Sequence, residues 1–241
     1  MTFIGRFIIG PYAKGKKECI DLQIKKTGLI LFFLVLFSTI SFASPLEDYS
    51  QGKWAVDINW RPNLKMNNRY DGYYQGSYVY SANRSLDGKN GNFDWDVTIG
   101  LGNKLAFQFG QYNPKAAFGV GMNTWEANLL YKLGKNISLF AGYHNAHYSG
   151  EQSFQTKGIL QGGLIAYRNI TNKTTLYGVV GFGKDLLNWE AGISYHISKN
   201  VDFNLSYRYK NVKKLYDASG DFSFHDDVIA KGIGYGVTLK F

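Results

Sequence analysis

His196 and Ser198 are the residues of this 241-residue chain whose types and spacing come nearest to catalytic chemistry. In an extended strand, residues two apart point to the same side, so an imidazole there could take the proton of a hydroxyl nucleophile. Ser198, however, falls in a predicted tight turn and is followed by Lys199. We therefore expect no catalytic residues here and predict that the protein is not an enzyme.

Metal and cofactor motifs are weak as well. His144 and His147 are three residues apart, and on a strand this odd spacing places the two rings on opposite faces. The glycine-rich run 178–184 is followed by Asp185 where a phosphate-binding loop has Ser or Thr, and a strand rather than a helix is expected after it. The sequence predicts neither a metal ion nor a cofactor.

Charged residues recur on one side of segments in which apolar and polar residues alternate. In residues 54–61, for example, large apolar residues alternate with Ala55, Asp57, Asn59 and Arg61. The charged residues expected on this inner side are Asp57, Arg61, Asp94, Asp96, Glu126, Lys132, Glu190, Asp202, Arg208, Lys210 and Lys240. Because acids and bases nearly balance, we predict an internal network of ion pairs and hydrogen bonds; the alternative is a narrow water-filled path.

The elements that position these residues are predicted strands. Alternation of period two marks seven windows: 54–61, 93–101, 105–110, 125–133, 137–144, 189–197 and 201–210. Windows 159–169 and 174–184 are apolar on both sides and are assigned as strands from their position between turns. The last strand is 231–241, which gives ten strands in all.

Short and long connections alternate along the chain. Short turns rich in Gly, Asn and Lys fall at 102–103, 134–136, 171–173 and 198–200, and longer segments at 64–91, 113–123, 148–158, 185–188 and 211–230. Transmembrane barrels have short periplasmic turns and longer external loops. We therefore predict an all-β fold, a single antiparallel transmembrane barrel of about ten strands. Eight or twelve strands are the alternatives, because residues 73–80 could add a hairpin above the membrane or change the count by two.

The end of the chain fits a closing barrel strand. Ile233, Tyr235, Val237, Leu239 and Phe241 alternate with small or polar residues. One such face suits lipid and the other a barrel lumen. The pattern also resembles the C-terminal signature of bacterial outer-membrane barrels. That resemblance implies that Tyr235, Val237, Leu239 and Phe241 form a signal read by the barrel assembly machinery.

The start of the chain has the features of a signal peptide. A long n-region, 1–26, ends in two lysines and precedes an apolar core at 28–40, which is short for a membrane-spanning helix. Small residues at Ser41 and Ala43 place cleavage after Ala43, so the domains are a signal peptide, 1–43, and a barrel, 44–241. The single cysteine, Cys19, falls in the leader. We expect export to the bacterial outer membrane.

Charge argues against nucleic acid as a partner. The formal net charge is +9, and removing the six bases and two acids of the leader leaves +5. These bases are scattered, without the run or stripe that nucleic-acid binding uses. Proximity to outer-membrane lipid and anionic lipopolysaccharide accounts for them.

Taken together, the leader, the alternating strands and the closing GIGYGVTLKF resemble the small opacity-type outer-membrane barrels of diderm bacteria. The resemblance covers most of 52–241 and is closest at 189–210, a strand, a short Asn turn and a strand ending in Tyr-Arg-Tyr. It implies fold and location rather than one function, since the family includes adhesins, small pores and members without an assigned role.

Two enzyme families bear a weaker resemblance. His196 and Ser198 resemble a motif of outer-membrane lipid A deacylases, but Lys199 and Lys210 stand where that family has Asn and its catalytic Glu. The run 225–227, His-Asp-Asp, is the only cluster similar to the site of omptin proteases, and a solvated polar loop explains it.

The external loops are the expected seat of specific function. The first contains Tyr70, Tyr73, Tyr74, Tyr78 and Tyr80, which suit a binding surface for an unknown host or cell-surface ligand. The alternative is that these tyrosines only extend a hairpin into the lipopolysaccharide layer. We predict a structural or surface-binding barrel with a largely plugged lumen. A narrow porin-like diffusion channel is the alternative, and a lipid A-modifying enzyme is the remote one.

Overall fold

The computed structural model describes residues 46–87, 91–116, 121–149, 154–218 and 220–241; the predicted signal peptide lies outside these ranges. Twelve strands occur in them. They are β1 (Trp54–Arg61), β2 (Lys65–Tyr74), β3 (Ser77–Asp87), β4 (Asn92–Gly102), β5 (Leu105–Tyr112), β6 (Gly121–Lys132), β7 (Ile137–Ser149), β8 (Phe154–Asn169), β9 (Thr174–Gly183), β10 (Leu186–Ser198), β11 (Val201–Ala218) and β12 (Phe222–Lys240).

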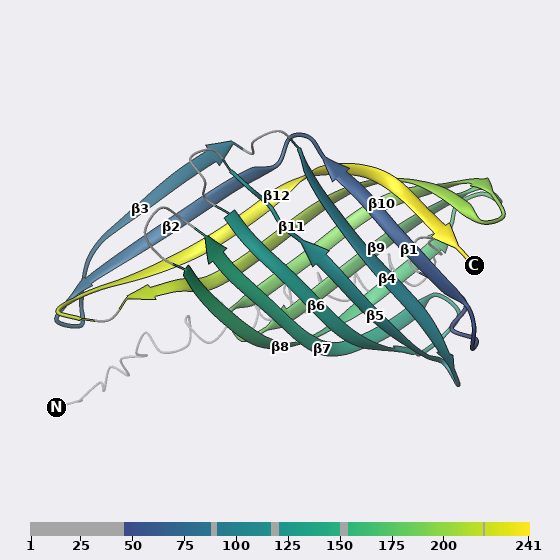
Figure 1. The fold of residues 1–241 in the computed structure, drawn as a ribbon, viewed down its shortest axis with the longest axis horizontal. Coiled ribbons are helices and arrows are strands. Elements are labelled where there is room, and N and C mark those ends of the chain that lie inside the picture. The colour runs from purple at the N-terminus through teal and green to yellow at the C-terminus, as the bar shows by residue number, and fades with distance from the viewer. Residues whose placement is uncertain (1–45, 88–90, 117–120, 150–153, 219) are drawn as a thin grey trace, which may run out of the picture. The chain divides into compact units, whose positions relative to one another are not determined.

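Ten of these strands form a closed antiparallel barrel (Figure 1). The order is β1-β4-β5-β6-β7-β8-β9-β10-β11-β12, and β12 returns to β1 in a register that runs from Ala55↔Lys240 to Trp60↔Tyr235. Closure pairs the backbone groups of every wall strand and leaves no free edge in the wall. The predicted fold class, an antiparallel barrel of about ten strands, is confirmed.

β2 and β3 form a hairpin outside this ring. β2 pairs with the first half of β12, Phe222–Lys231, so the hairpin continues the wall as a sheet beyond the barrel (Figure 1). The tip turns on Gln75 and Gly76, both at positive φ, which matches the twist that two-residue hairpin turns require. The first long segment therefore does hold a hairpin, and the barrel itself stays at ten strands. We call β2, β3 and the adjoining parts of β11 and β12 the sheet extension.

Several connections predicted as loops are strand instead. The segment 211–230 is mostly β11 and β12, which stay paired as far as Ala218↔Phe224. The segment 185–188 is reduced to the turn Lys184-Asp185, because β10 already begins at Leu186. Cross-strand pairing continues past the lipid-facing part of the wall. There Leu186, Val212, Leu215, Val228 and Ala230 belong to an apolar interior, so the alternation of a polar inner face with an apolar outer face ends.

The two ends of the barrel differ. At one end, the turn end, lie the short turns, the start of β1 and the chain terminus Phe241. Asn103, at positive φ, forms one of these turns. At the other, the hairpin end, lie the sheet extension, the connection between β5 and β6, and the two-residue turn Lys184-Asp185.

The buried side chains of the interior group in layers. An apolar cluster at the hairpin end consists of Leu64, Met66, Tyr112, Ala116, Met122, Ala146, Tyr148, Ile159, Leu186, Val212, Leu215, Val228 and Ala230. A second apolar cluster at the turn end consists of Leu46, Tyr49, Ala55, Ala106, Leu130, Phe140, Ile165, Ala166, Tyr167 and Tyr177. Between these two clusters lies a polar layer, which forms the candidate functional site.

Candidate functional site

Four charged side chains form a closed set in the polar layer. Arg61 Nε lies 2.5 Å from Asp94 Oδ2, and Arg61 Nη2 lies 3.2 Å from Glu190 Oε2. Arg208 contacts the same two carboxylates, with Nη1 3.4 Å from Asp94 Oδ2 and Nε donating to Glu190 Oε2. Arg61 is fully buried. Each buried charge therefore has two opposite charges beside it, which offsets the cost of removing it from water.

A single aromatic ring closes this charged set toward the hairpin end. The Tyr112 ring centroid lies 6.0 Å from Arg61 Cζ, 5.2 Å from Arg208 Cζ and 5.2 Å from Lys210 Nζ. Rings attract cations at such distances when both are removed from water. Tyr112 thus lies at the boundary between the polar layer and the apolar cluster at the hairpin end.

Glu126 belongs to a second, neighbouring network. Its Oε2 accepts a hydrogen bond from Gln161 Nε2 at 3.0 Å and lies 3.5 Å from His144 Nδ1. His144 faces the lumen and is fully buried, whereas His147 lies on the other face and contacts Thr156. The two histidines do not converge on one site.

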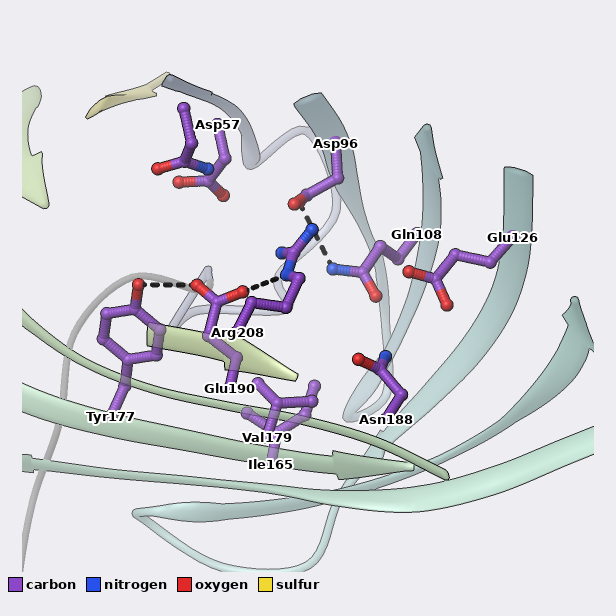
Figure 2. A pocket seen from close by; sticks show the side chains of 11 residues that line it. Asp57, Asp96, Gln108, Glu126, Ile165, Tyr177, Val179, Asn188, Glu190 and Arg208 are labelled. Carbon is purple, nitrogen blue, oxygen red and sulfur yellow. Dashed lines mark hydrogen bonds and ion pairs between the residues drawn. The ribbon is translucent and has the colours of Figure 1, made fainter. Parts of the chain in front are cut away.

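A cavity lies within the polar layer (Figure 2). The volume open to the centres of water-sized molecules is about 70 Å³, enough for a few waters. It is lined by Asp57, Asn59, Asp96, Gln108, Glu126, Ile165, Tyr177, Val179, Asn188, Glu190 and Arg208. Its lining can hold water or a small polar or cationic species, and it offers no apolar pocket for a larger ligand.

His196 at the turn end has the partners of a catalytic base without a usable nucleophile. Its Nδ1 lies 2.6 Å from Asp202 Oδ1, and its Nε2 lies 3.3 Å from Thr175 Oγ1. Thr175 is fully buried and donates its proton to Asn169 at 2.8 Å. A β-bulge between His196 and Ser198 removes Ser198 from the face that the spacing predicted for it.

The remaining predicted lumen residues lie apart from the central set. Asp202 pairs with Lys240 at 2.6 Å, close to the turn end. Lys132 donates to the backbone carbonyl of Glu47 and lies 5.8 Å from the Tyr49 ring centroid. The alternation in the sequence predicts that these residues lie on the inner face of the barrel. It does not predict their positions along the barrel axis.

Sequence reasoning missed the segment Leu46–Ser50, which occupies the turn-end mouth. Leu46 and Tyr49 are buried in the turn-end cluster, and Tyr49 donates a hydrogen bond to Ser138 Oγ at 3.1 Å. The Gly102 amide donates to the Tyr49 carbonyl at 2.8 Å. Burial in this position raises the pKa of the Glu47 carboxyl. The segment carries no periodic pattern, so nothing in the sequence alone signals its place.

The five tyrosines of the first predicted loop divide between the two faces of the sheet extension. Tyr73 contacts Tyr78 with ring centroids 5.8 Å apart, and also contacts His225 at 5.1 Å. On the other face, Tyr74 lies against Phe222 and Tyr80 against Phe224. The Tyr70 hydroxyl accepts a hydrogen bond from the buried Asn68. Residues 225–227 are strand rather than solvated loop, and Asp226 is fully buried.

The outer wall of the barrel is apolar. Large exposed side chains include Ile58, Ile99, Phe107, Leu129, Leu139, Ile193, Leu205 and Ile233. Aromatic rings follow one another around the wall from Trp95 through Phe109 and Trp125 to Tyr143, with centroids 5.5–6.2 Å apart. An apolar band with such an aromatic girdle fits a membrane and its interface.

In the described ranges there is no helix able to span a membrane. Those ranges also contain no cluster of three or more His, Cys, Asp or Glu side chains that could chelate a metal.

The chain is similar in fold to known barrels. No family model matches it, and no curated protein does. Among solved structures, the outer membrane protease OmpT from Escherichia coli is 11% identical, with a TM-score of 0.48, and the match covers 85% of this chain and 100% of that one. Neisserial surface protein A is 15% identical, with a TM-score of 0.37 and coverage of 79% and 100%. OprG from Pseudomonas aeruginosa is 13% identical, with a TM-score of 0.34 and coverage of 82% and 99%. At these values the similarities carry no argument about activity or partner.

Proposed function

We propose that the protein is an integral outer-membrane β-barrel with a closed lumen, which acts through the sheet extension outside the membrane. The apolar wall supports the membrane location, because a water-soluble protein rarely exposes so large a contiguous apolar surface. The closed ring of strands supports it too, since it leaves no unpaired edge in lipid. Lipid, lipopolysaccharide and the assembly machinery are the proposed general partners.

The filled lumen is the observation that carries the proposal. Two apolar clusters close the two ends, and the Arg61–Glu190 and Arg208–Asp94 pairs cross the space between them. A ten-stranded barrel is only slightly wider than one that its side chains fill. These layers argue against the continuous water path that a diffusion channel would need.

The orientation follows from the two ends of the barrel. The turn end would face the periplasm, because outer-membrane barrels keep their short turns on that side. Cleavage of the predicted leader after Ala43 would leave the chain start there as well. The sheet extension would then project from the outer surface of the cell, where a ligand can reach it.

The free edge of β3 supports a binding role for the extension. Among the described residues, β3 pairs with β2 alone. Residues 77–85 are all exposed, with Tyr78 at 59% and Tyr80 at 44%. Exposed edges are usually blocked by charged residues, lysine above all, or by proline; residues 77–85 contain no lysine or proline, and Arg84 is their one charged residue. An edge with so little charge outside the membrane suits contact with another molecule.

A binding assay on whole cells tests this role one face at a time. Cells displaying the wild type, a Tyr73→Ser/Tyr78→Ser variant or a Tyr74→Ser/Tyr80→Ser variant would be applied to immobilised glycans and matrix proteins. We expect wild-type cells to bind one class of these targets and one of the two variants to lose that binding. If all three strains bind the targets equally, with equal amounts of the protein on the cell surface, the result would argue for a purely structural barrel.

A further inference from the structure

A group of lysines lies at the hairpin end, at the point where β11 continues past the start of β10. Four lysines and two carboxylates from β8, the turn between β9 and β10, β11 and β12 make up this group. We call it the lysine platform, and it consists of Lys157, Lys184, Asp185, Lys213, Lys214 and Asp227. Its formal charge is +2.

Hydrogen bonds hold the lysine platform together. Lys157 Nζ lies 2.9 Å from Asp185 Oδ2 and donates to the carbonyl of Lys213 at 2.7 Å. The Lys213 amide donates to the carbonyl of Asp185 at 2.8 Å, and the Lys214 amide donates to Asp227 Oδ1 at 2.9 Å. Segments that are far apart in the sequence are therefore fixed to one another at this rim of the barrel.

The backbone of β11 bulges within the platform. The register with β12 shifts between Val212 and Tyr216, and Lys214 has a φ of 49°. A bulge redirects side chains, and a residue other than glycine adopts such a φ at an energetic cost. Here Lys213 and Lys214 are both exposed, whereas Leu215 is buried. The bulge thus turns two consecutive lysines outward.

Three of the four ammonium groups are left for an external partner. Asp185 compensates Lys157, but among the described side chains no carboxylate lies within ion-pair distance of Lys184, Lys213 or Lys214. A hydrogen bond from Lys157, together with the charges of Lys184 and Lys214, lowers the pKa of Asp185, so these cations act on one small region. An anion with several oxygens would relieve the repulsion among such closely placed ammonium groups.

Aromatic and apolar side chains cover the outer face of the same strands on the membrane side of the platform. Trp189 stacks on Tyr207 and Tyr209, with ring centroids 5.4 Å and 5.8 Å away. Leu187, two residues nearer to the platform on β10, is 43% exposed. Lys213 follows Tyr209 by four residues, about 13 Å along a strand. Because tryptophan and tyrosine mark the membrane interface, the platform lies where lipid phosphates are expected.

We propose that the lysine platform binds a phosphate group of lipopolysaccharide, whose acyl chains then lie along the outer face of β9, β10 and β11. Lysine binds phosphate as a point charge, and clusters of lysine beside a membrane surface recognise anionic lipid headgroups. A soluble polyanion would need the charge alone, whereas the adjoining apolar and aromatic surface favours an anion that carries acyl chains. This assignment rests on the membrane location and orientation proposed above, and it is independent of any ligand at the edge of β3.

Native mass spectrometry of the refolded protein in non-ionic detergent tests the site, with lipid A as the probe. We expect lipid A that carries both of its phosphates to bind at least about tenfold more tightly than lipid A from which both have been removed. Inorganic phosphate and dextran sulfate serve as probes without acyl chains. We expect both to bind more weakly than phosphorylated lipid A.

Two double variants separate the platform from general charge effects. Lys213→Gln/Lys214→Gln should weaken binding of phosphorylated lipid A at least about tenfold and leave binding of the dephosphorylated form unchanged. The matched control, Lys135→Gln/Lys199→Gln, removes the same charge from exposed turns at the turn end. It should bind both forms as the wild type does.

Three results would overturn the proposal. Equal weakening in the two double variants would indicate general attraction of anions, and equal binding of the two forms of lipid A would indicate the apolar wall alone. Tighter binding of dextran sulfate than of lipid A, lost in the platform variant, would make a soluble polyanion the occupant. Insertion into vesicles is measured separately by heat-modifiable gel mobility. A barrel that inserts but gives one of these results leaves the proposed function standing, whereas a protein that does not insert overturns both.

Discussion

Arg61 on β1 reaches Glu190 on β10, with 3.2 Å between Nη2 and Oε2, although β11 and β12 separate these strands in the wall. The same guanidinium binds Asp94 on β4 at 2.5 Å. One side chain thus links three strands through the lumen. Wall residues therefore link strands across the middle of the lumen, whereas the segment Leu46–Ser50 occupies its turn-end mouth.

Removing Arg61 should destabilise the barrel strongly. Arg61→Met keeps much of the volume but leaves Asp94 and Glu190 with less positive charge in a buried layer, and we expect a loss of about 3–5 kcal/mol in the free energy of unfolding. Urea titration of the protein refolded in lipid vesicles measures it. The control is Arg69→Met, whose side chain is 54% exposed beside Asp71 and should cost at most about 1 kcal/mol. Equal losses for the two variants would contradict the central role of Arg61.

A charge on the wall should show where the lipid lies. Ile193 is 43% exposed near the middle of β10, opposite Leu205 in the register. Ile193→Arg should cost about 2–4 kcal/mol in the same unfolding assay, whereas Ile170→Arg, at a turn, should cost about 0–1 kcal/mol. A neutral effect at position 193 would mean that this face does not meet the membrane core.

The last residue should matter for assembly. Phe241 stacks on Trp54 with ring centroids 3.9 Å apart, and the two residues exchange backbone hydrogen bonds where β12 meets β1. We expect Phe241→Ala to lower the amount of folded protein in the outer membrane severalfold, measured by heat-modifiable gel mobility. Phe222→Ala, in the sheet extension, serves as the control. Wild-type levels of the first variant would remove Phe241 from the proposed assembly signal.

The segment at the turn-end mouth should dock in a pH-dependent manner. Burial raises the pKa of Glu47 above its ordinary 4.5, so the docked segment holds a proton more tightly than the free one. Docking is therefore strongest below pH 4.5 and weakens as pH rises through the raised pKa. Hydrogen-exchange protection of the Gly102 amide, which binds the Tyr49 carbonyl, reports this equilibrium.

Two variants test whether Glu47 is the group that makes docking depend on pH. Glu47→Gln should remove the loss of protection on raising the pH. Asp48→Asn should not, because hydrogen bonds from Ser50 lower the pKa of Asp48, in the direction opposite to the shift of Glu47. A pH response that persists in Glu47→Gln would assign the titration to another group.

The sequence predicted the wall well because the wall separates two environments. Residues 54–61 alternate with period two, and β1 has these same bounds. The windows 159–169 and 174–184 lack alternation for a reason visible in the fold: Ile165, Tyr167 and Tyr177 point inward but belong to the turn-end apolar cluster. An apolar interior therefore obscures the pattern that a polar one reveals.

The site was less predictable, because it depends on how the barrel closes. Arg61 and Glu190 are 129 residues apart, and their meeting is set by strand number and stagger rather than by local pattern. The β-bulge that displaces Ser198 and the placement of Leu46–Ser50 have no periodic signal either. The inner face could be read from the sequence, but the grouping of its residues into networks could not.

Planar-bilayer conductance of the refolded protein tests the closed lumen most directly, after a shift in gel mobility has shown that it is folded. We predict an inserted barrel without discrete conductance steps, because two apolar clusters and the Arg61–Glu190 pair occupy successive levels of the lumen. Reproducible steps that change with Glu126→Gln or Arg208→Gln would contradict this account and identify the protein as a narrow channel.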